Sequence, residues 1–303
     1  MDRTVEGYLA QLKSHLAGAD PAVVQDAVYD AEEYLRDALA EGDGTAETFA
    51  AVIEAYGTPE EVAASYRDVE VTVAAALRKP VSSVKSSNPA ARFFGVVVDP
   101  AAWGSLFYMV LSLATGIVYF TVVVTGLSLT AGLAVLIIGI PFALLFLAVV
   151  RAISLAEGRV VEGLLGERMP RRPRTVGTAT GVWDRIKMWL VDFRTWTTML
   201  YMALQLVFGI VYFTVVATAA AVCVSLIVLP IAQVVSGAPV LVVGGYSYWI
   251  EPWAFPLFVG AGLIGWVLTL WIAKGIGQLH GMYAKVMLVG RLEQSVSSPA
   301  QVG

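Results

Sequence analysis

Two stretches of sequence, WGSLFYMVLSLATGIVYFTVV at residues 103–123 and WTTMLYMALQLVFGIVYFTVV at residues 196–216, decide the fold class. Each is uncharged and apolar, and about 20 such residues in a helix cross a hydrocarbon core of roughly 30 Å. At a constant offset of 93 residues, 13 of the 21 positions are identical, including the run Gly-Ile-Val-Tyr-Phe-Thr-Val-Val. Apolar composition alone does not keep Trp, Tyr and Met in register. The sequence therefore predicts an internal repeat that begins with a membrane-spanning helix.

The apolar regions around these stretches are longer than one crossing each. Lys and Arg are absent from residues 93–150 and 195–273, whereas one span needs only about 20 residues. We expect a turn at residues 126–132 to divide the first region and the segment 236–252 to divide the second. Four spans are therefore predicted, near residues 103–125, 131–150, 197–229 and 253–274.

Glycine and proline positions suggest how these spans pack. Gly116 and Gly209 hold the same place in the two copies, and small residues allow close approach of helices in membranes. Gly139 and Pro141 fall inside the second predicted span, where they are candidates for a kink or hinge. Each copy is a hairpin of two helices that enters from the same side, so the two repeats are expected to be parallel.

Polar and aromatic residues mark the expected membrane boundaries. Asp99, followed by Pro100, is placed to cap the first span, and Asp192 holds the equivalent place in the second copy. Trp103 and Trp196 follow as candidate interface anchors.

Charge divides the chain into an acidic head and a basic remainder. Hydrophobic residues make up 57% of the chain and charged ones only 15%. Residues 1–77 carry 16 of the 24 acidic residues and four basic ones. The connection 151–194 carries nine Lys or Arg residues, and the two outer connections carry none. By the positive-inside rule, both termini are expected in the cytoplasm and the protein in the cell membrane.

The head has the pattern of a small α-helical domain. Apolar residues recur at helical spacing, and Thr58-Pro-Glu-Glu61 is a capping box that opens its last helix. The predicted organisation is an acidic cytoplasmic helical domain at 1–77, a basic linker at 78–92, a membrane domain at 93–293 and a disordered tail at 294–303. The fold class is therefore all-α. Carboxylates of the head form either a partner surface or a solvated helix surface: Glu32, Glu33, Asp37, Glu60 and Glu61.

Several kinds of chemistry are not expected. A single Cys223 and two histidines exclude a disulfide framework and a Cys- or His-built metal site. Gly260-Ala-Gly-Leu-Ile-Gly265 lies inside an apolar helix, so a dinucleotide site is rejected. The predicted spans contain no Lys, Arg, Asp or Glu, so the usual marker of ion or proton pathways is missing. His280 has no acid near it in sequence and is expected to be unremarkable. We expect no enzyme activity, cofactor or metal.

Short motifs carry two resemblances. Tyr8-Leu-x-x-Leu12, Asp30-Ala-Glu-Glu-Tyr-Leu35 and Tyr56-Gly-Thr-Pro-Glu-Glu-Val-Ala63 resemble the HAAS signalling domain of prokaryotic membrane proteins. Asp99-x-x-x-Trp103, Leu106-Phe-Tyr108, Gly139-Ile-Pro141, Arg151 and Leu164-Leu-Gly166 resemble the "putative sensor" membrane domain, which occurs before histidine kinases and in stand-alone proteins. The resemblances imply a signalling or regulatory role without naming a ligand.

Three functions remain open. The leading hypothesis is a four-span signalling protein that senses within the bilayer and signals through its head. The alternative is an accessory or docking subunit of a membrane transporter complex, and the third is a small transporter. Expected partners are membrane lipids and a cytoplasmic regulator or membrane protein. Homo-oligomerisation stays open, and direct nucleic-acid binding is not expected.

Overall fold

The computed structural model describes residues 4–40, 45–77, 88–134, 136, 138–172 and 192–289. This part of the chain is helical apart from one short β-hairpin, which confirms the predicted all-α class. The head contains α1 (Val5–His15), α2 (Pro21–Ala40), α3 (Ala46–Tyr56) and α4 (Pro59–Leu77). Next come α5 (Pro89–Phe94) and the 3-10 turn η1 (Gly95–Val98). Then follow α6 (Pro100–Leu133), α7 (Gly139–Leu165), α9 (Phe193–Ser236), β1 (Leu241–Val243), β2 (Tyr246–Tyr248), η2 (Pro252–Ala254) and α10 (Phe255–Leu288).

The head, helices α1–α4, is built around a hydrophobic core of its own. Leu12, Leu16 and Leu35 are fully buried in this core, and Phe49 packs into it from α3. The Tyr8 hydroxyl donates a hydrogen bond to the carbonyl of Gly57 at 2.8 Å, which ties α1 to the turn between α3 and α4. Since these contacts lie within the head, we expect residues 1–77 to fold as a separate unit.

The capping box at the start of α4 gives the head a pH-dependent element. The Glu61 carboxylate accepts hydrogen bonds from the Thr58 backbone N–H at 2.8 Å and from its hydroxyl at 2.9 Å. These bonds lower the pKa of Glu61 below its ordinary value of 4.5, and the bond from the backbone N–H has the larger effect. The stabilisation is therefore complete above pH 4.5 and is lost as the pH falls through the lowered value.

We expect Glu61→Gln to flatten this pH dependence. The variant should be less stable than wild type at pH 7, and the gap should narrow as the pH is lowered toward 3. Thermal unfolding of residues 1–77, followed by circular dichroism at several pH values, measures it. Glu60→Gln, in the same turn, controls for the loss of one negative charge. A stability difference between wild type and Glu61→Gln that stays constant with pH would show that the ionised Glu61 does not stabilise the start of α4.

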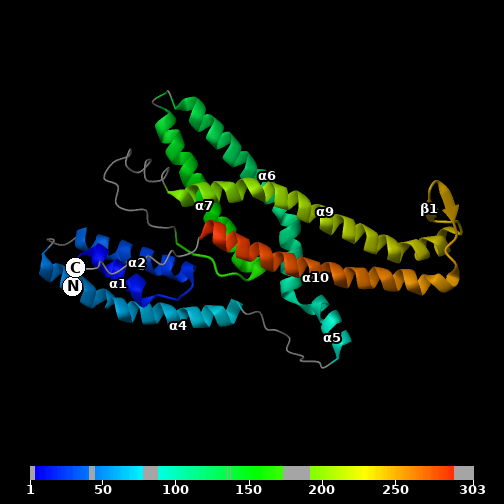
Figure 1. Ribbon diagram of the computed structural model, residues 1–303, viewed down its shortest axis with the longest axis horizontal. Helices are drawn as coiled ribbons and strands as arrows, with labels where there is room; N and C mark the ends of the chain where they lie inside the picture. The colour runs from blue at the N-terminus through cyan, green and yellow to red at the C-terminus, as the bar shows by residue number, and fades with distance from the viewer. Residues whose placement is uncertain are drawn as a thin grey trace, which may run out of the picture.

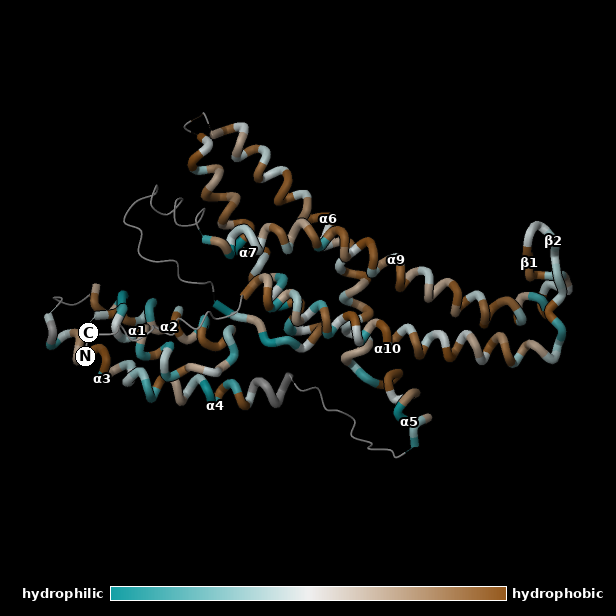
Figure 2. Tube along the Cα trace, viewed as in Figure 1, coloured by the Kyte–Doolittle hydropathy of each residue, from teal (hydrophilic) through white to brown (hydrophobic). Residues whose placement is uncertain are grey.

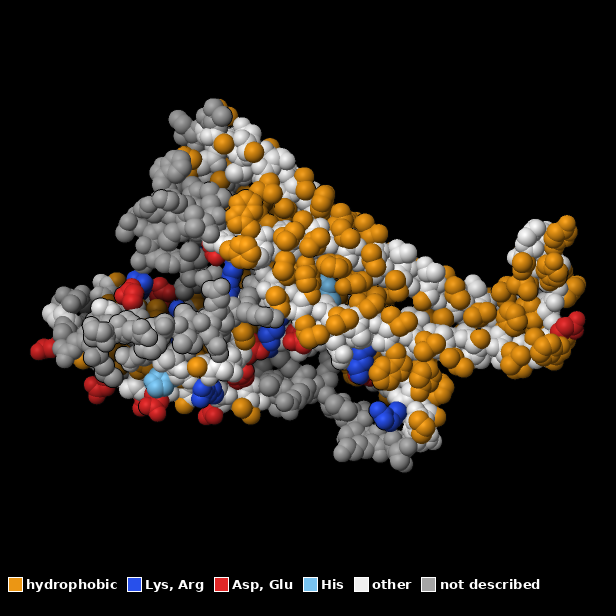
Figure 3. All heavy atoms as spheres, viewed as in Figure 1, with side chains coloured by type: hydrophobic (Ala, Val, Ile, Leu, Met, Phe, Trp, Pro, Cys, Tyr) orange, Lys and Arg blue, Asp and Glu red, His pale blue; other side chains and the backbone are white. Residues whose placement is uncertain are grey.

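The four long helices α6, α7, α9 and α10, here called the bundle, are each long and apolar enough to cross a membrane. They form two hairpins, α6–α7 and α9–α10, which diverge from a crossing between α6 and α9 (Figure 1). Hydrophobic residues run along all four helices, whereas the head alternates between hydrophilic and hydrophobic residues (Figure 2). On the surface, apolar side chains gather over the bundle, and most of the acidic ones lie on or next to the head (Figure 3). The molecule is a multi-pass membrane protein with a polar head.

The crossing of α6 and α9 brings two glycines against backbone. A Cβ on Gly116 would meet the carbonyl oxygen of Gln205 at 2.6 Å, and a Cβ on Gly209 would meet that of Ser112 at 2.4 Å. Gln205 follows Ser112 by the same 93 residues that separate the two glycines. Each copy therefore offers the same groove to the other, and only a hydrogen in place of a side chain permits this approach.

The predicted turn at residues 126–132 is wrong, because α6 continues to Leu133. Gly126 is a packing residue: a Cβ there would meet the Phe146 ring of α7 at 2.1 Å. The chain turns between Leu133 and Gly139, where a Cβ on Gly139 would meet the carbonyl of Leu133. Pro141 consequently lies in the first turn of α7, where proline is tolerated, and it does not kink the span.

Other regular elements also extend into segments that were predicted as turns or linkers. Helix α9 passes through Pro230 and ends at Gly237, whose φ of 60° suits a glycine cap. The hairpin β1–β2 then turns at Gly244 and Gly245, both with positive φ. Residues 88–92 of the predicted basic linker form the start of α5, with the Asn88 side chain as its cap. Linker residues 78–87 and the predicted disordered tail, 294–303, lie outside the described residues.

Candidate functional site

Four tyrosines from the repeat point into the interior of the bundle. Tyr108 and Tyr119 lie on α6, and Tyr201 and Tyr212 hold the equivalent positions on α9. Tyr108 and Tyr201 are 1% and 0% exposed, and their hydroxyls lie 3.4 Å apart. A buried hydroxyl needs a partner to offset its loss of water. The repeat thus places two pairs of hydroxyl groups inside an apolar bundle.

One half of the bundle supplies a carboxylate to these tyrosines. Glu157 of α7 is 1% exposed. Its Oε1 accepts hydrogen bonds from the Tyr108 hydroxyl at 2.6 Å and from the Tyr201 hydroxyl at 2.9 Å. Its Oε2 accepts one from the Tyr119 hydroxyl at 2.7 Å. An ionised carboxylate is an acceptor only, so three convergent donors suit the charged form.

The other half supplies an imidazole. His280 of α10 is 2% exposed, with Nε2 at 2.8 Å from the Tyr108 oxygen and Nδ1 at 3.0 Å from the Tyr212 oxygen. Since Tyr108 gives its proton to Glu157, we assign the ring proton to Nε2, which donates to Tyr108. Nδ1 then accepts from Tyr212, so a neutral imidazole satisfies this network.

Aromatic rings enclose the imidazole. The ring centroids of five residues lie 5.0–6.0 Å from that of His280: Tyr108, Tyr201, Phe208, Tyr212 and Tyr283. Gln205 donates to the Tyr108 oxygen at 3.0 Å, and its own Oε1 has no hydrogen-bond partner among the described residues. The site has one unused buried acceptor next to its central tyrosine.

The two copies of the repeat use one pair of equivalent tyrosines differently. Tyr119 bonds Glu157 in the first half, and its equivalent Tyr212 bonds His280 in the second. Tyr108 lies between them and bonds both groups. An acid on α7 and a base on α10 thus bond equivalent tyrosines of the two copies. Ionisable groups buried in a membrane protein are costly and mark functional positions.

Two expectations about charge are corrected here. The predicted second span ended at residue 150, so Glu157 was excluded from the bundle interior. Helix α7 instead runs to Leu165 and buries Glu157. His280, expected to have no acid nearby, is linked to Glu157 through Tyr108. The available signal was the recurrence of both tyrosines in the two copies, since hydroxyl groups in apolar spans need polar partners.

Comparison with known families identifies the bundle. A family model described as "Putative sensor" matches residues 108–288, which is more than half of the chain. The chain belongs to this family. A second model, HAAS, matches residues 7–65 of the head. No curated protein and no solved structure matches the chain. Both resemblances expected from the motifs are confirmed.

The HAAS head docks on the segment that follows α7 of the sensor bundle. The Oδ1 atom of Asp26 accepts hydrogen bonds from the backbone N–H groups of Arg171 at 2.7 Å and Arg172 at 2.8 Å. Arg168 lies 3.6 Å from the same carboxylate. Burial raises the pKa of Asp26, and these partners oppose that rise. They offset the cost of burying its charge.

Further ion pairs connect the head to both α7 and α10. Arg172 pairs with Asp30 of α2 at 2.8 Å, and Lys285 of α10 pairs with Asp20 at 2.5 Å. On the bundle side, Glu162 of α7 holds Arg168 at 3.0 Å. We call this set of contacts between residues 20–30 and residues 162–172 and 285 the joint. It attaches the HAAS head to the two helices that carry Glu157 and His280.

The predicted boundary residues lie at the starts of α6 and α9. The Asp99 side chain accepts a hydrogen bond from the Ala101 N–H at 2.9 Å, and Asp192 accepts one from the Arg194 N–H at 3.2 Å. Asp99 also pairs with Lys274 of α10 at 2.7 Å. Trp103 and Trp196 are 42% and 47% exposed on the outside of the sensor bundle.

The head carboxylates considered as a partner surface do not share one place. Glu33 and Asp37 line a hollow on α2 with Tyr34 and Tyr56, whose rings stack. Glu32 pairs with Arg36 at 3.0 Å, and Glu60 and Glu61 open α4. Among the described residues, no three His, Cys, Asp or Glu side chains are grouped to hold a metal ion.

Proposed function

We propose that this protein is a signalling protein of the cell membrane that responds within the bilayer and acts on a cytoplasmic regulator through its HAAS head. The proposal places both termini in the cytoplasm, in line with the nine basic residues of segment 151–194. It assigns the head a binding role and no catalytic one. The observation that carries it is the joint, through which the head contacts the segment after α7 and Lys285 of α10.

The spacing on α7 and α10 explains how a change inside the bundle reaches the head. Glu157 and Glu162 are five residues apart on α7, and His280 and Lys285 are five residues apart on α10. Five residues of helix rise about 7.5 Å, so each buried group lies little more than one turn from a joint contact. A change in the hydrogen bonds of Glu157 or His280 shifts or rotates these helix ends. Such small helix shifts are a common means of transmission.

The central test is partner capture from the native membrane. The full-length protein is purified in mild detergent beside an Asp26→Ala variant, and bound proteins are identified. A transcription regulator or a kinase whose yield changes in the variant supports the proposal. A permease or ATPase held equally by both proteins would instead favour the accessory subunit of a transporter complex.

We expect Asp26→Ala to release the head from the bundle. The change removes the acceptor of two backbone N–H groups and leaves Arg168 without this partner, at a cost of about 1–3 kcal/mol for a buried unsatisfied group. Amide hydrogen exchange of Arg171 and Arg172 should become faster in the intact protein. Asp37→Ala, an exposed position on the same helix, is the matched control and should leave exchange unchanged. Unchanged amide exchange at Arg171 and Arg172 in Asp26→Ala would show that Asp26 does not hold the head on the bundle.

A further variant tests whether the bundle and the head are coupled. Glu157→Gln keeps the shape of the side chain but turns one acceptor into a donor that faces a tyrosine hydroxyl. The same amides of Arg171 and Arg172 should change their exchange rate, although the substitution does not touch the joint. Glu251→Gln, on the exposed connection before α10, is the control. If exchange at the joint is identical in Glu157→Gln and wild type, no signal passes from the buried network.

A further inference from the structure

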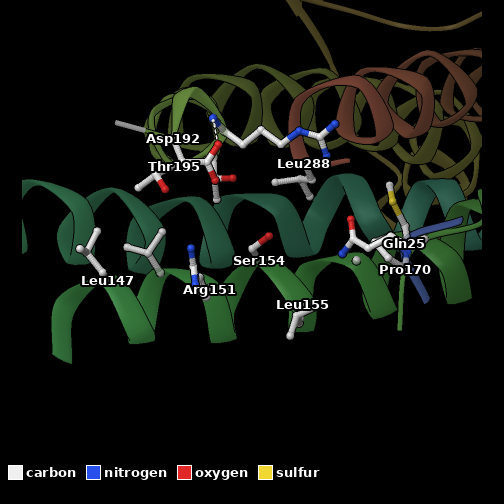
Figure 4. A pocket seen from close by; sticks show the side chains of 14 residues that line it. Gln25, Leu147, Arg151, Ser154, Leu155, Pro170, Asp192, Thr195 and Leu288 are labelled. Carbon is white, nitrogen blue, oxygen red and sulfur yellow. Dashed lines mark hydrogen bonds between the residues drawn. The ribbon is translucent and has the colours of Figure 1, made fainter. Parts of the chain in front are cut away.

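A pocket of about 90 Å³ lies where α7, the start of α9 and the head meet (Figure 4). Arg151 and Ser154 rise into it from α7 toward Asp192 and Thr195 of the opposite side. One buried water needs roughly 10–15 Å³ in the same measure, so the pocket has room for a group of the size of a phosphate. Its polar lining also includes Arg194.

The pocket lies where the two halves of the bundle stop resembling each other. At the start of α6, Asp99 pairs with Lys274 of α10 at 2.7 Å. Gly277 of α10 lies so close to Ser105 of α6 that a Cβ would meet the serine hydroxyl at 2.2 Å. That interface is closed.

The equivalent residues of α7 and α9 line the pocket. Asp192 and Thr198 stand 93 residues after Asp99 and Ser105. Arg151 and Ser154 precede Glu157 by the same six and three residues by which Lys274 and Gly277 precede His280. Helix α7 contacts α9 at only a few points, and these residues line a cavity instead of a packed seam.

We propose that this pocket binds the phosphate headgroup of an anionic membrane phospholipid. Arg151 and Arg194 supply two guanidinium groups, which match phosphate oxygens in a bidentate geometry. Ser154 and Thr195 add hydroxyl donors. With the Asp192 carboxylate included, the ionisable side chains of the lining carry a net charge of +1. This assignment names the class of ligand for the proposed function. It rests on that function only in its claim that the protein responds to the bilayer.

The remaining lining favours a lipid over a free anion. Leu155 and Leu288 line the same pocket and are only partly buried. Trp196, beside the pocket arginine of α9, is half-exposed as interfacial tryptophans are. A headgroup bound by Arg151 therefore has its acyl chains next to these leucine side chains, whereas inorganic phosphate makes no use of them.

A bound headgroup would also touch the joint. Gln25 of the head lines the pocket and donates a hydrogen bond to the Arg172 carbonyl at 2.8 Å. Met169 and Pro170 line it from the other side and directly precede the two amides that Asp26 binds. An occupied pocket supports the segment on which the head rests, so lipid binding is expected to tighten docking of the head.

The experiment compares the full chain in nanodiscs of phosphatidylcholine with and without phosphatidylglycerol, and counts retained lipids by native mass spectrometry. Phosphatidylglycerol should raise the thermal midpoint by several degrees and leave one retained molecule per protein. It should also slow amide exchange at Arg171 and Arg172 severalfold. The double variant Arg151→Gln/Arg194→Gln should lose all three effects. Arg92→Gln, an exposed arginine of α5 outside the pocket, controls for the loss of a positive charge and should keep them.

A second variant protects the test against misfolding of the arginine variants. Ser154→Leu fills the pocket without changing charge and should abolish lipid retention while the protein without phosphatidylglycerol keeps its thermal midpoint. Retention of phosphatidylglycerol by both pocket variants would overturn the site. An equal stabilisation by millimolar inorganic phosphate in phosphatidylcholine would overturn its assignment to a lipid. Because partner capture and the Glu157→Gln exchange test do not depend on this pocket, failure here is distinguishable from failure of the proposed function.

Discussion

Gly116→Leu and Gly209→Leu are each expected to open the crossing of α6 and α9 and to lower the thermal stability of the protein in detergent by similar, large amounts. At both positions a Cβ alone would lie 2.4–2.9 Å from backbone atoms of the other helix. Overpacking of a core costs about 1–3 kcal/mol where side chains can move aside. Backbone atoms cannot rotate away, so the two helices must separate, and the loss should exceed that range.

A glycine on the same helix provides the control for this experiment. Gly132 of α6 has no atom within 4 Å of where its Cβ would lie, so Gly132→Leu should leave the unfolding midpoint nearly unchanged. Unfolding is followed by loss of the monodisperse peak on size-exclusion chromatography after heating. If Gly116→Leu is as stable as Gly132→Leu, the close approach of the two helices is not what holds the bundle together.

Glu157→Leu is expected to be the most damaging single change in the polar network. Leucine has a similar volume but no acceptor, so the hydroxyls of Tyr108, Tyr119 and Tyr201 lose a shared partner. Each buried unsatisfied group costs about 1–3 kcal/mol, so the total should reach about 3 kcal/mol or more. Tyr119→Phe, which removes one donor and leaves two, should cost only about 1 kcal/mol.

Combining the substitutions distinguishes lost hydrogen bonds from lost packing. Replacing both partners of a buried hydrogen bond by apolar groups of the same shape is often nearly neutral. Tyr119→Phe should therefore be less destabilising in the Glu157→Leu background than in wild type, in a double-mutant cycle of thermal stability. Strictly additive effects would show that Tyr119 and Glu157 do not interact in the membrane.

Most of the architecture could be predicted because it depends on local composition and on the repeat. Apolar length requires four spans, and the identical block around Gly116 and Gly209 identifies the faces that meet. The caps follow from Asp99-Pro100 and Asp192, since their side chains serve helix ends within two residues. Thr58 and Glu61 likewise act within a single turn.

The candidate site was missed because its residues meet only through tertiary packing. Glu157 lies seven residues beyond the apolar run of α7, so composition assigns it to the water side, yet helix continuation and packing against α6 and α9 bury it. His280 is separated from Glu157 by 123 positions, and no local pattern relates them. The turn after α6 was misplaced for a related reason: Gly126 serves the Phe146 ring, and a glycine in sequence does not distinguish a bend from a packing contact.

The unequal lengths of the repeated helices have a mechanical consequence. Helix α6 has 34 residues and α9 has 44, which correspond to about 51 Å and 66 Å of helix for a hydrocarbon core of roughly 30 Å. Helices of this length tilt in the bilayer and extend beyond its hydrocarbon core. Because α6 and α9 touch backbone to backbone at Gly116 and Gly209, neither can tilt alone. If the protein responds within the bilayer as proposed, a change in bilayer thickness is expected to change the angle between these two helices.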